Sequence, residues 1–193
     1  MPVKTATVSD RDRAIAAVVL GFAADPVARW SYPAPHDYLM WFPRIVSLLG
    51  GRAFEHGTAY YIDNFRGAAL WLPPEVEPEA EEMMALLERT VGEQRLEELF
   101  SLLEQMGNFH PAEPHWYLPL IGVDPTQQGK GRGSALMAHA LIRCDREQRL
   151  AYLESTNPRN VRLYQRHGFE VLGTIQGGSF PPVTPMLRKP RAP

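Results

Sequence analysis

The chain has 193 residues, of which 45% are hydrophobic and 22% are charged, and its formal net charge is −2. This length supports one well-filled core, and without a long run of Lys or Arg a nucleic-acid-binding face is disfavoured, because phosphate binding rests on clustered cations. No apolar stretch approaches the roughly 20 residues of a membrane span, no secretory signal is evident, and a single cysteine, Cys144, excludes an intramolecular disulfide framework. We therefore predict a single domain, 1–193, in the cytoplasm, without nucleic-acid or membrane partners.

The first half of the chain predicts a strand, several helices and a hairpin. The alternating segment VKTATVS predicts an opening strand, and Ser9 is the expected N-cap of the amphipathic helix that follows. The segment DPVARWSYPAP predicts a loop, and part of the range 36–49 predicts a second helix, which Pro43 starts or kinks. TAYYID and AALWLPP predict a hairpin, and the Glu- and Leu-rich range 78–106 predicts two helices separated at Gly92.

Strands and helices alternate in the second half, which makes the class α/β. HWYLPLIGV and LAYLES predict strands on either side of a helix, and RNVRLYQRH predicts a short helix that ends at Gly168. FEVLGTI and VTPMLRK complete a mixed sheet. Pro119 lies inside the first of these strands, where proline is tolerated mainly at a bulge. We expect that bulge to bend the strand away from its neighbour and to leave a gap in the sheet. Cys144, on the apolar side of the intervening helix, is a predicted core thiol rather than a nucleophile.

Three glycines stand at alternate positions, Gly129, Gly131 and Gly133, in the segment DPTQQGKGRGSALMAH (124–139). The segment joins a strand end to a helix start, where successive amides point into one concavity and the helix dipole adds partial positive charge. The expected guest is a phosphate or pyrophosphate. The spacing fits neither the Walker loop nor the dinucleotide-binding pattern. A tight glycine turn without a ligand is the alternative.

Two segments together resemble a known family. QGKGRG, from Gln128 to Gly133, fits the signature Q/R-x-x-G-x-G/A of the GNAT superfamily of acyl-CoA-dependent N-acetyltransferases. NPRNVRLYQRHGF resembles that family's second cofactor motif, an Asn followed by Tyr-x-x-x-Gly-Phe. With EPHWYL and GVDPTQQGKGRGSAL, these segments resemble most nearly the puromycin N-acetyltransferases, over the range 109–169. Asn160 departs from the pattern, since a small residue is common there in the superfamily.

The resemblance implies a single-domain α/β fold, in which helices flank a mixed, mostly antiparallel sheet of six to seven strands with a bulged, splayed central pair. It implies acetyl-CoA in the gap, held by a cofactor half of about 109–176, while 1–108 contributes the acceptor site. The pantetheine arm would pair with main chain near Ile121 and Val123, and no metal is expected. The expected cofactor-binding residues are these two together with Gln128, Gly129, Lys130, Gly131, Arg132, Gly133, Ser134, Asn157 and Asn160.

Acetyl transfer to an amine poses two proton problems. An alkyl amine with a pKa of about 10 is protonated at pH 7, and the departing thiolate benefits from a proton. Tyr164 aligns with the family's tyrosine and is the candidate acid, the alternative being a core tyrosine. Glu154, at the end of a predicted central strand, is the favoured base, because a carboxylate there is uncommon unless it is paired or used. Glu113, His115, water or a purely structural Glu154 are the alternatives.

The acceptor site is expected in the aromatic segment 26–42 and the loop QGGSFPP. Trp30, Tyr32 and Trp41 are the candidate substrate-binding residues, as an apolar lid for a drug-like or aromatic amine; ordinary packing is the alternative. The resemblance thus predicts acetyl transfer from acetyl-CoA to a small-molecule primary amine by direct attack in a ternary complex. A non-catalytic CoA sensor or interaction module, or an enzyme for protein and peptide amines, is the alternative. The sequence neither predicts nor excludes a homodimer.

Overall fold

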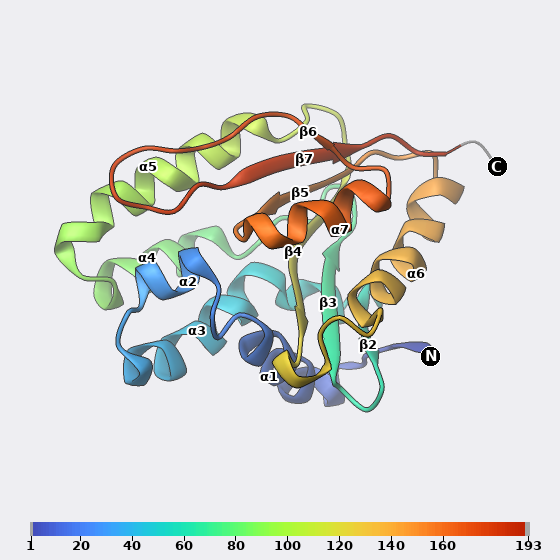
Figure 1. The fold of residues 1–193 in the computed structure, drawn as a ribbon, viewed down its shortest axis with the longest axis horizontal. Coiled ribbons are helices and arrows are strands. Elements are labelled where there is room, and N and C mark those ends of the chain that lie inside the picture. Colours follow the sequence, from blue (N-terminus) through green and yellow to red (C-terminus); the bar gives the residue numbers. More distant parts are fainter. Residues whose placement is uncertain (1, 192–193) are drawn as a thin grey trace.

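A seven-stranded sheet runs through the computed structural model, which describes residues 2–191 (Figure 1). Its order is β1-β2-β3-β4-β5-β7-β6, and every neighbouring pair is antiparallel except β4 and β5. The predicted fold class is confirmed. The strands are β1 (Val3–Thr5), β2 (Ala59–Ile62), β3 (Gly67–Leu72), β4 (Trp116–Val123), β5 (Ala151–Ser155), β6 (Glu170–Val171) and β7 (Thr184–Arg188).

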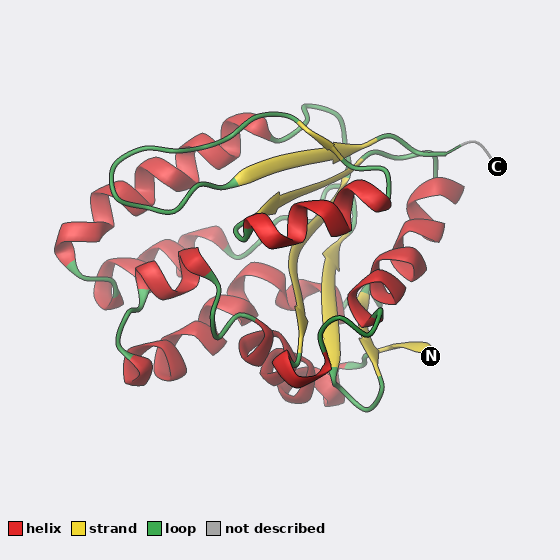
Figure 2. Cartoon of the chain, in the orientation of Figure 1, coloured by secondary structure: helices red, strands yellow, loops and turns green. Residues whose placement is uncertain are grey.

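Helices cover both faces of the sheet (Figure 2). The buried apolar side chains form two clusters. One cluster lies beneath α6 and α7, and the other is built with α1 to α5. No helix within residues 2–191 is long and apolar enough to cross a bilayer. The helices are α1 (Arg11–Gly21), α2 (Pro26–Ser31), α3 (Pro35–Gly50), α4 (Ala80–Thr90), α5 (Glu93–Phe109), α6 (Arg132–Arg146) and α7 (Val161–Arg166).

Several local predictions are confirmed. The hairpin is β2–β3, and α4 and α5 are separated at Gly92. Pro43 lies inside α3 rather than at its start. Gly168 follows α7 with a φ of +88°, the left-handed conformation that favours glycine. Cys144 is fully buried, and burial raises the pKa of its thiol to about 12, which suits a core residue.

The start of α1 and the segment before α3 differ from prediction. The carboxylate of Asp10 accepts hydrogen bonds from the amide (3.1 Å) and hydroxyl (2.9 Å) of Thr7, so these two residues rather than Ser9 form the capping turn. The predicted loop contains α2, because Asp25 accepts the amides of its first turn and Pro26 occupies the first helical position. Asp25 followed by Pro26 is a helix-start signal. The prediction of a loop gave more weight to the aromatic residues and prolines of the segment.

Strand β6 is shorter than the predicted FEVLGTI. It pairs only with β7, at the edge of the sheet, and ends at Val171. At Gly173 the chain passes the ring of Phe109 so closely that a Cβ would lie 3.2 Å from it. At this point the chain contacts α5 instead of pairing with β7. Antiparallel pairing resumes only at the isolated bridge between Ile175 and Val183.

The bulge predicted at Pro119 is present. Leu120 lies opposite Leu70 and Tyr117 opposite Leu72, so two residues of β4 face one of β3. Toward β5, β4 is paired only at Trp116 and Tyr117. Beyond that point the two strands separate, as predicted.

Helix α1 fixes the position of β4 by direct backbone contact. A Cβ on Gly122 would lie 2.7 Å from the Cα of Val18, and a Cβ on Gly21 would lie 2.6 Å from the Cα of Gly122. Any side chain at Gly21 or Gly122 would force helix and strand apart. The bulged strand is therefore held from one face by a contact that only glycines permit.

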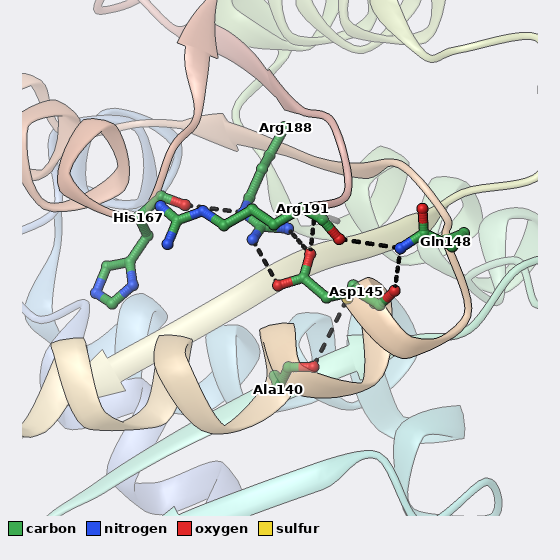
Figure 3. Close-up of polar contacts among 7 residues, drawn as sticks. Ala140, Asp145, Gln148, His167, Arg188 and Arg191 are labelled. Carbon is green, nitrogen blue, oxygen red and sulfur yellow. Dashed lines mark hydrogen bonds and ion pairs between the residues drawn. The ribbon is translucent and has the colours of Figure 1, made fainter. Parts of the chain in front are cut away.

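A charged network ties the end of α6 to β7 (Figure 3). Arg188 is 2% exposed, and its two terminal nitrogens donate to the carboxylate of Asp145 at 2.7 and 2.8 Å. Its Nε donates to the carbonyl of His167 (2.8 Å), and Asp145 also accepts the amide of Arg191 (2.8 Å). The guanidinium–carboxylate pair holds the pKa of Asp145 below its usual range. A buried cation is thus fully paired where helix, sheet and C-terminal segment meet.

We predict that Asp145→Asn destabilises the protein by about 3 kcal/mol at pH 7, because it leaves the buried Arg188 without a counter-charge. Since the folded pKa of Asp145 is lowered, its contribution is present above the unfolded value of about 3.9 and is lost as the pH falls through the folded value. In urea unfolding, the difference in unfolding free energy between Asp145→Asn and the unaltered protein should therefore be smaller at pH 3 than at pH 7. Glu88→Gln, at an exposed carboxylate of α4, is the control and should change little. Equal stability of Asp145→Asn and the unaltered protein at pH 7 would contradict the prediction.

Candidate active site

The gap between β4 and β5 exposes one edge of β4. The amide of Asp124 donates to the carbonyl of Arg66 on the β3 side (2.9 Å). In an antiparallel pair, successive residues direct their peptide groups to opposite sides. Asp124, Gly122 and Leu120 therefore face β3, while the peptide groups of Ile121 and Val123 face the gap. These are the two positions where the family resemblance implies pairing with an extended, amide-bearing group.

The glycine loop follows directly and presents a row of unused amides. Gly129 and Gly131 have φ values of +73° and +80°, and a Cβ on either would meet no atom within 4 Å. Within residues 2–191, no backbone amide from 128 to 134 donates a hydrogen bond. Gly131 is the N-cap of the 15-residue helix α6, so the helix dipole adds partial positive charge here. This chemistry fits a pyrophosphate.

The cations of the loop have different environments. Arg132 is buried, and its guanidinium forms an ion pair with Asp63 at 2.7 Å. Its side chain is therefore committed to the β2–β3 turn, and only its amide is left for a ligand. Lys130 is exposed and donates to the carbonyl of Thr126 (3.1 Å). The side chain of Gln128 donates to the last carbonyl of β4 (3.1 Å), which ties the loop to the strand.

The remaining predicted cofactor residues lie around α7. The hydroxyl of Ser134 is 2.8 Å from Nε2 of His167, and burial lowers the pKa of that imidazole. Asn157 caps the turn after β5 by accepting the amide of Arg159 (3.1 Å), and Asn160 is exposed at the end of this turn.

Tyr164 lies in α7 and is 5% exposed. Burial raises the pKa of its phenol, and the negative charge of Asp25 adds to the shift. The hydroxyl is therefore protonated at neutral pH, the state that an acid requires. Its ring meets Phe169 edge-on with the centroids 6.3 Å apart, which also suits a core residue.

Glu154 is half-buried as a residue but its side chain is only 2% exposed, so the exposed part is main chain in the gap. Its Oε1 lies 3.0 Å from Nε2 of His110. Burial, reinforced by the charge of Glu154, raises the pKa values of Tyr117 and Tyr152. The carboxylate thus faces inward among one imidazole and two neutral phenols.

The structure gathers the alternative bases into one row. Nδ1 of His115 lies 2.8 Å from the carbonyl of Glu113, and its Nε2 lies 3.3 Å from Nδ1 of His110. Glu113 therefore takes part in this row through its main-chain carbonyl and not through its carboxylate. Sequence reasoning missed His110, because its place beside Glu154 depends on how α5 ends. Within residues 2–191, no group of three or more His, Cys, Asp or Glu could hold a metal ion.

A cavity of about 590 Å³ opens beside this row. Pro119 and Leu120 both line it. In a regular strand, successive side chains point to opposite faces of the sheet, so two neighbours can line one cavity because they lie at the bulge. Leu and Met side chains of α4 and α5 form one wall, and side chains of α2 and α3, among them Val27, Phe42 and Ile45, form another. Asp25 and Thr156 also line the cavity, joined by a 2.6 Å hydrogen bond. Burial raises the pKa of Asp25.

The predicted substrate residues separate in the structure. Tyr32 lines the cavity, and its hydroxyl is 2.7 Å from that of Thr90. Trp30 instead donates to the hydroxyl of Ser179 (3.1 Å) and packs edge-on against Phe180. Trp41 is half-buried against the core and is not part of the cavity wall. The predicted segment 26–42 lines the cavity through Val27, Ala28, Ser31, Tyr32 and Phe42, and α4 and α5 supply a further wall. Sequence reasoning missed that further wall, because an apolar face that packs and one that lines a cavity have the same pattern.

Comparison with known proteins agrees with this geometry. Residues 91–171 match the family model described as the acetyltransferase (GNAT) domain. A crystal structure from Corynebacterium glutamicum, described as histone acetyltransferase HPA2 and related acetyltransferase, is 26% identical, with a TM-score of 0.69 over 99% of this chain and 97% of that one.

Two further structures share the fold at lower identity. The polyamine N-acetyltransferase of Drosophila melanogaster is 17% identical, with a TM-score of 0.64 over 97% of this chain and 99% of that one. Arylalkylamine N-acetyltransferase 2 of Aedes aegypti is 15% identical, with a TM-score of 0.68 over 98% and 99%. Residues 91–171 thus match a GNAT acetyltransferase domain, and the chain as a whole has the fold of the compared acetyltransferase structures.

Proposed function

We propose that the protein transfers an acetyl group from acetyl-CoA to the primary amine of a small, drug-like or aromatic molecule, by direct attack in a ternary complex. One observation carries the proposal: a large apolar cavity meets the open edge of β4 beside the buried carboxylate of Glu154. Residues 109–176 form the cofactor half, and 1–108 supply most of the cavity. From the amino-acid composition of the chain, the cytoplasm is the expected compartment.

Acetyl-CoA binding is supported by the chemistry of the gap. The peptide groups of Ile121 and Val123 are available for the amides of a pantetheine arm, and the amides of 128–134 are available for its pyrophosphate. When bound, acetyl-CoA supplies the activated acetyl group. The chain's own residues then position it, exclude water and move protons.

We predict that Gly131→Glu weakens acetyl-CoA binding at least tenfold, about 1.4 kcal/mol, because a carboxylate side chain would enter the anion-binding loop. Gly57→Glu is the matched control, since Gly57 also has a positive φ (+63°) with open space around it but lies in the turn before β2. Thermal shift with about 1 mM acetyl-CoA and calorimetric titration measure the effect. The unaltered protein and the control should shift alike. Failure of the unaltered protein to shift, or full binding by Gly131→Glu, would count against the loop as the cofactor site.

The proton roles follow from the two buried groups. Glu154 lies at the junction of cavity and gap, where an ammonium must lose a proton before its nitrogen can attack. Tyr164 keeps its proton at neutral pH and is the donor for the departing thiolate. Glu154 takes one proton from the ammonium, and as the N–C bond forms and the C–S bond breaks, the phenol proton of Tyr164 goes to sulfur. The nitrogen then loses its second proton, which restores the phenol.

We predict distinct kinetic signatures for the two groups. Tyr164→Phe should keep acetyl-CoA affinity within a few-fold while kcat falls by about 10², because the ring still packs but the proton is gone. Glu154→Gln should lose a similar factor at pH 7, and the loss should shrink as the pH rises and the amine deprotonates itself. Single-turnover measurement separates chemistry from product release. A normal single-turnover rate for Tyr164→Phe would make it a packing residue, and a pH-independent loss for Glu154→Gln would remove it as the base.

The lining of the cavity favours an acceptor with one charged end and an apolar body. No Lys or Arg among the described residues lines it, its carboxylates are Asp25, Glu77 and Glu154, and most of its other lining side chains are apolar. A second cation on the acceptor would lie among apolar side chains and would be costly to bury. Arylalkylamines therefore fit better than polyamines.

We predict at least tenfold higher kcat/KM for arylalkylamines or puromycin than for agmatine, spermidine, aminoglycosides, amino acids or a lysine peptide, measured by thiol release from acetyl-CoA. Leu103→Gln, in the cavity wall of α5, should reduce kcat/KM for the bulky amines more than for methylamine. Leu96→Gln is the control on the same helix, outside the cavity wall. A preference for the lysine peptide would favour a protein substrate, and binding without turnover of any amine would favour a sensor.

A further inference from the structure

One buried side chain holds the glycine loop that precedes α6. The three glycines have no side chain of their own, and from 123 to 135 Arg132 is the only buried residue. Its guanidinium forms the ion pair with Asp63 (2.7 Å) and donates to the carbonyl of Gln127 (3.4 Å). Arg132 therefore joins three segments, which are the start of α6, the turn before the loop and the β2–β3 turn.

The position of this guanidinium depends on Asp63. The side chain of Arg132 is 9% exposed, and its Nε has no hydrogen-bond partner among residues 2–191. Asp63 supplies the one carboxylate within ion-pair distance in the same part of the chain. Loss of one partner from a buried ion pair leaves an uncompensated charge, whereas loss of both partners can be nearly neutral. Without Asp63, the guanidinium would have to leave its site, and the loop would move with it.

The turn that carries Asp63 has an uncommon backbone. Asp63, Asn64 and Phe65 have φ values of +49°, +53° and +67°, so three consecutive residues are left-handed without a glycine among them. Asp and Asn tolerate this conformation, but a bulky residue such as Phe rarely adopts it. Such strain persists only where the surrounding structure holds it, and it concentrates near active sites and ligand-binding residues.

Helix α1 holds the strained turn in place. Nη2 of Arg13 donates to Oδ1 of Asn64 (2.7 Å), and the guanidinium carbon of Arg13 lies 4.0 Å from the ring centroid of Phe65. The ring of Phe65 also stacks on that of Tyr61, with the centroids 4.0 Å apart. These contacts fix the shape of the turn, so that its first residue, Asp63, faces Arg132.

We propose that Asp63 is a positioning residue for acetyl-CoA, which acts through Arg132 to hold the glycine loop with its amides free for the pyrophosphate. The inference rests on the proposed function, since it concerns the loop that would bind the cofactor. The ion pair also keeps the guanidinium on the β2–β3 turn, so the main chain of the loop rather than this side chain meets the ligand. A residue of the 1–108 part thereby contributes to cofactor binding from a distance.

The test compares Asp63→Asn with the unaltered full chain. We expect the calorimetric Kd for CoA and the KM for acetyl-CoA to rise about tenfold or more, while kcat and the KM for the amine stay within about threefold. S-acetylpantetheine carries the thioester without a pyrophosphate, so its kcat/KM as donor should also stay within about threefold. Asp145→Asn is the matched control, because it breaks a buried Arg–Asp pair at the other end of α6. It should lower stability in urea yet bind CoA within about threefold of the unaltered protein.

A double variant keeps the test decisive if Asp63→Asn does not fold. Asp63→Asn/Arg132→Met buries no unpaired charge, and it should bind CoA as weakly as Asp63→Asn but no more weakly, because both changes act at one contact. Unchanged CoA affinity in either variant, additive losses of Arg132→Met and Asp63→Asn, or an equal loss with S-acetylpantetheine would overturn the inference and leave the proposed function standing. If the unaltered protein binds CoA but acetylates no amine, the proposed function fails, and the calorimetric comparison still decides the role of Asp63.

Discussion

Pairing between β4 and β5 stops after Tyr117, and the site depends on that interruption. Pro119 has no amide hydrogen, and the bulge it occupies turns the following part of β4 away from its parallel neighbour. Peptide groups in the middle of a sheet are normally satisfied by the next strand. Here those of Ile121 and Val123 face an open gap, so an extended ligand with amide groups can take the place of a strand.

The same interruption brings two kinds of surface to one point. On β5, the main chain of Glu154 is exposed to the gap while its carboxylate is buried beside His110. On β4, Pro119 and Leu120 both turn toward the apolar cavity. A gap lined by free peptide groups and an apolar cavity therefore meet beside a buried carboxylate.

The rest of the fold holds this opening in place. Glycine contacts bring α1 against the backbone of β4, and the hydrogen bond from Thr156 to Asp25 joins the end of β5 to the start of α2. On the other side, the Asp145–Arg188 pair connects α6 to β7, the partner of β5. Each strand of the splayed pair is thus anchored separately, which allows the gap to persist although pairing would satisfy more backbone groups.

The sequence by itself determined the local features. The α/β class, the hairpin, the bulge at Pro119 and the glycine loop follow from residues a few positions apart, where backbone conformation and helix dipoles act. Only the tertiary structure decided which side chains meet. Arg132 pairs with Asp63, and His110 reaches Glu154. Helices α4 and α5 join α2 and α3 in lining the cavity, whereas Trp30 and Trp41 do not line it. Such contacts depend on how distant elements pack, and an apolar helix face has the same pattern whether it fills a core or encloses a cavity.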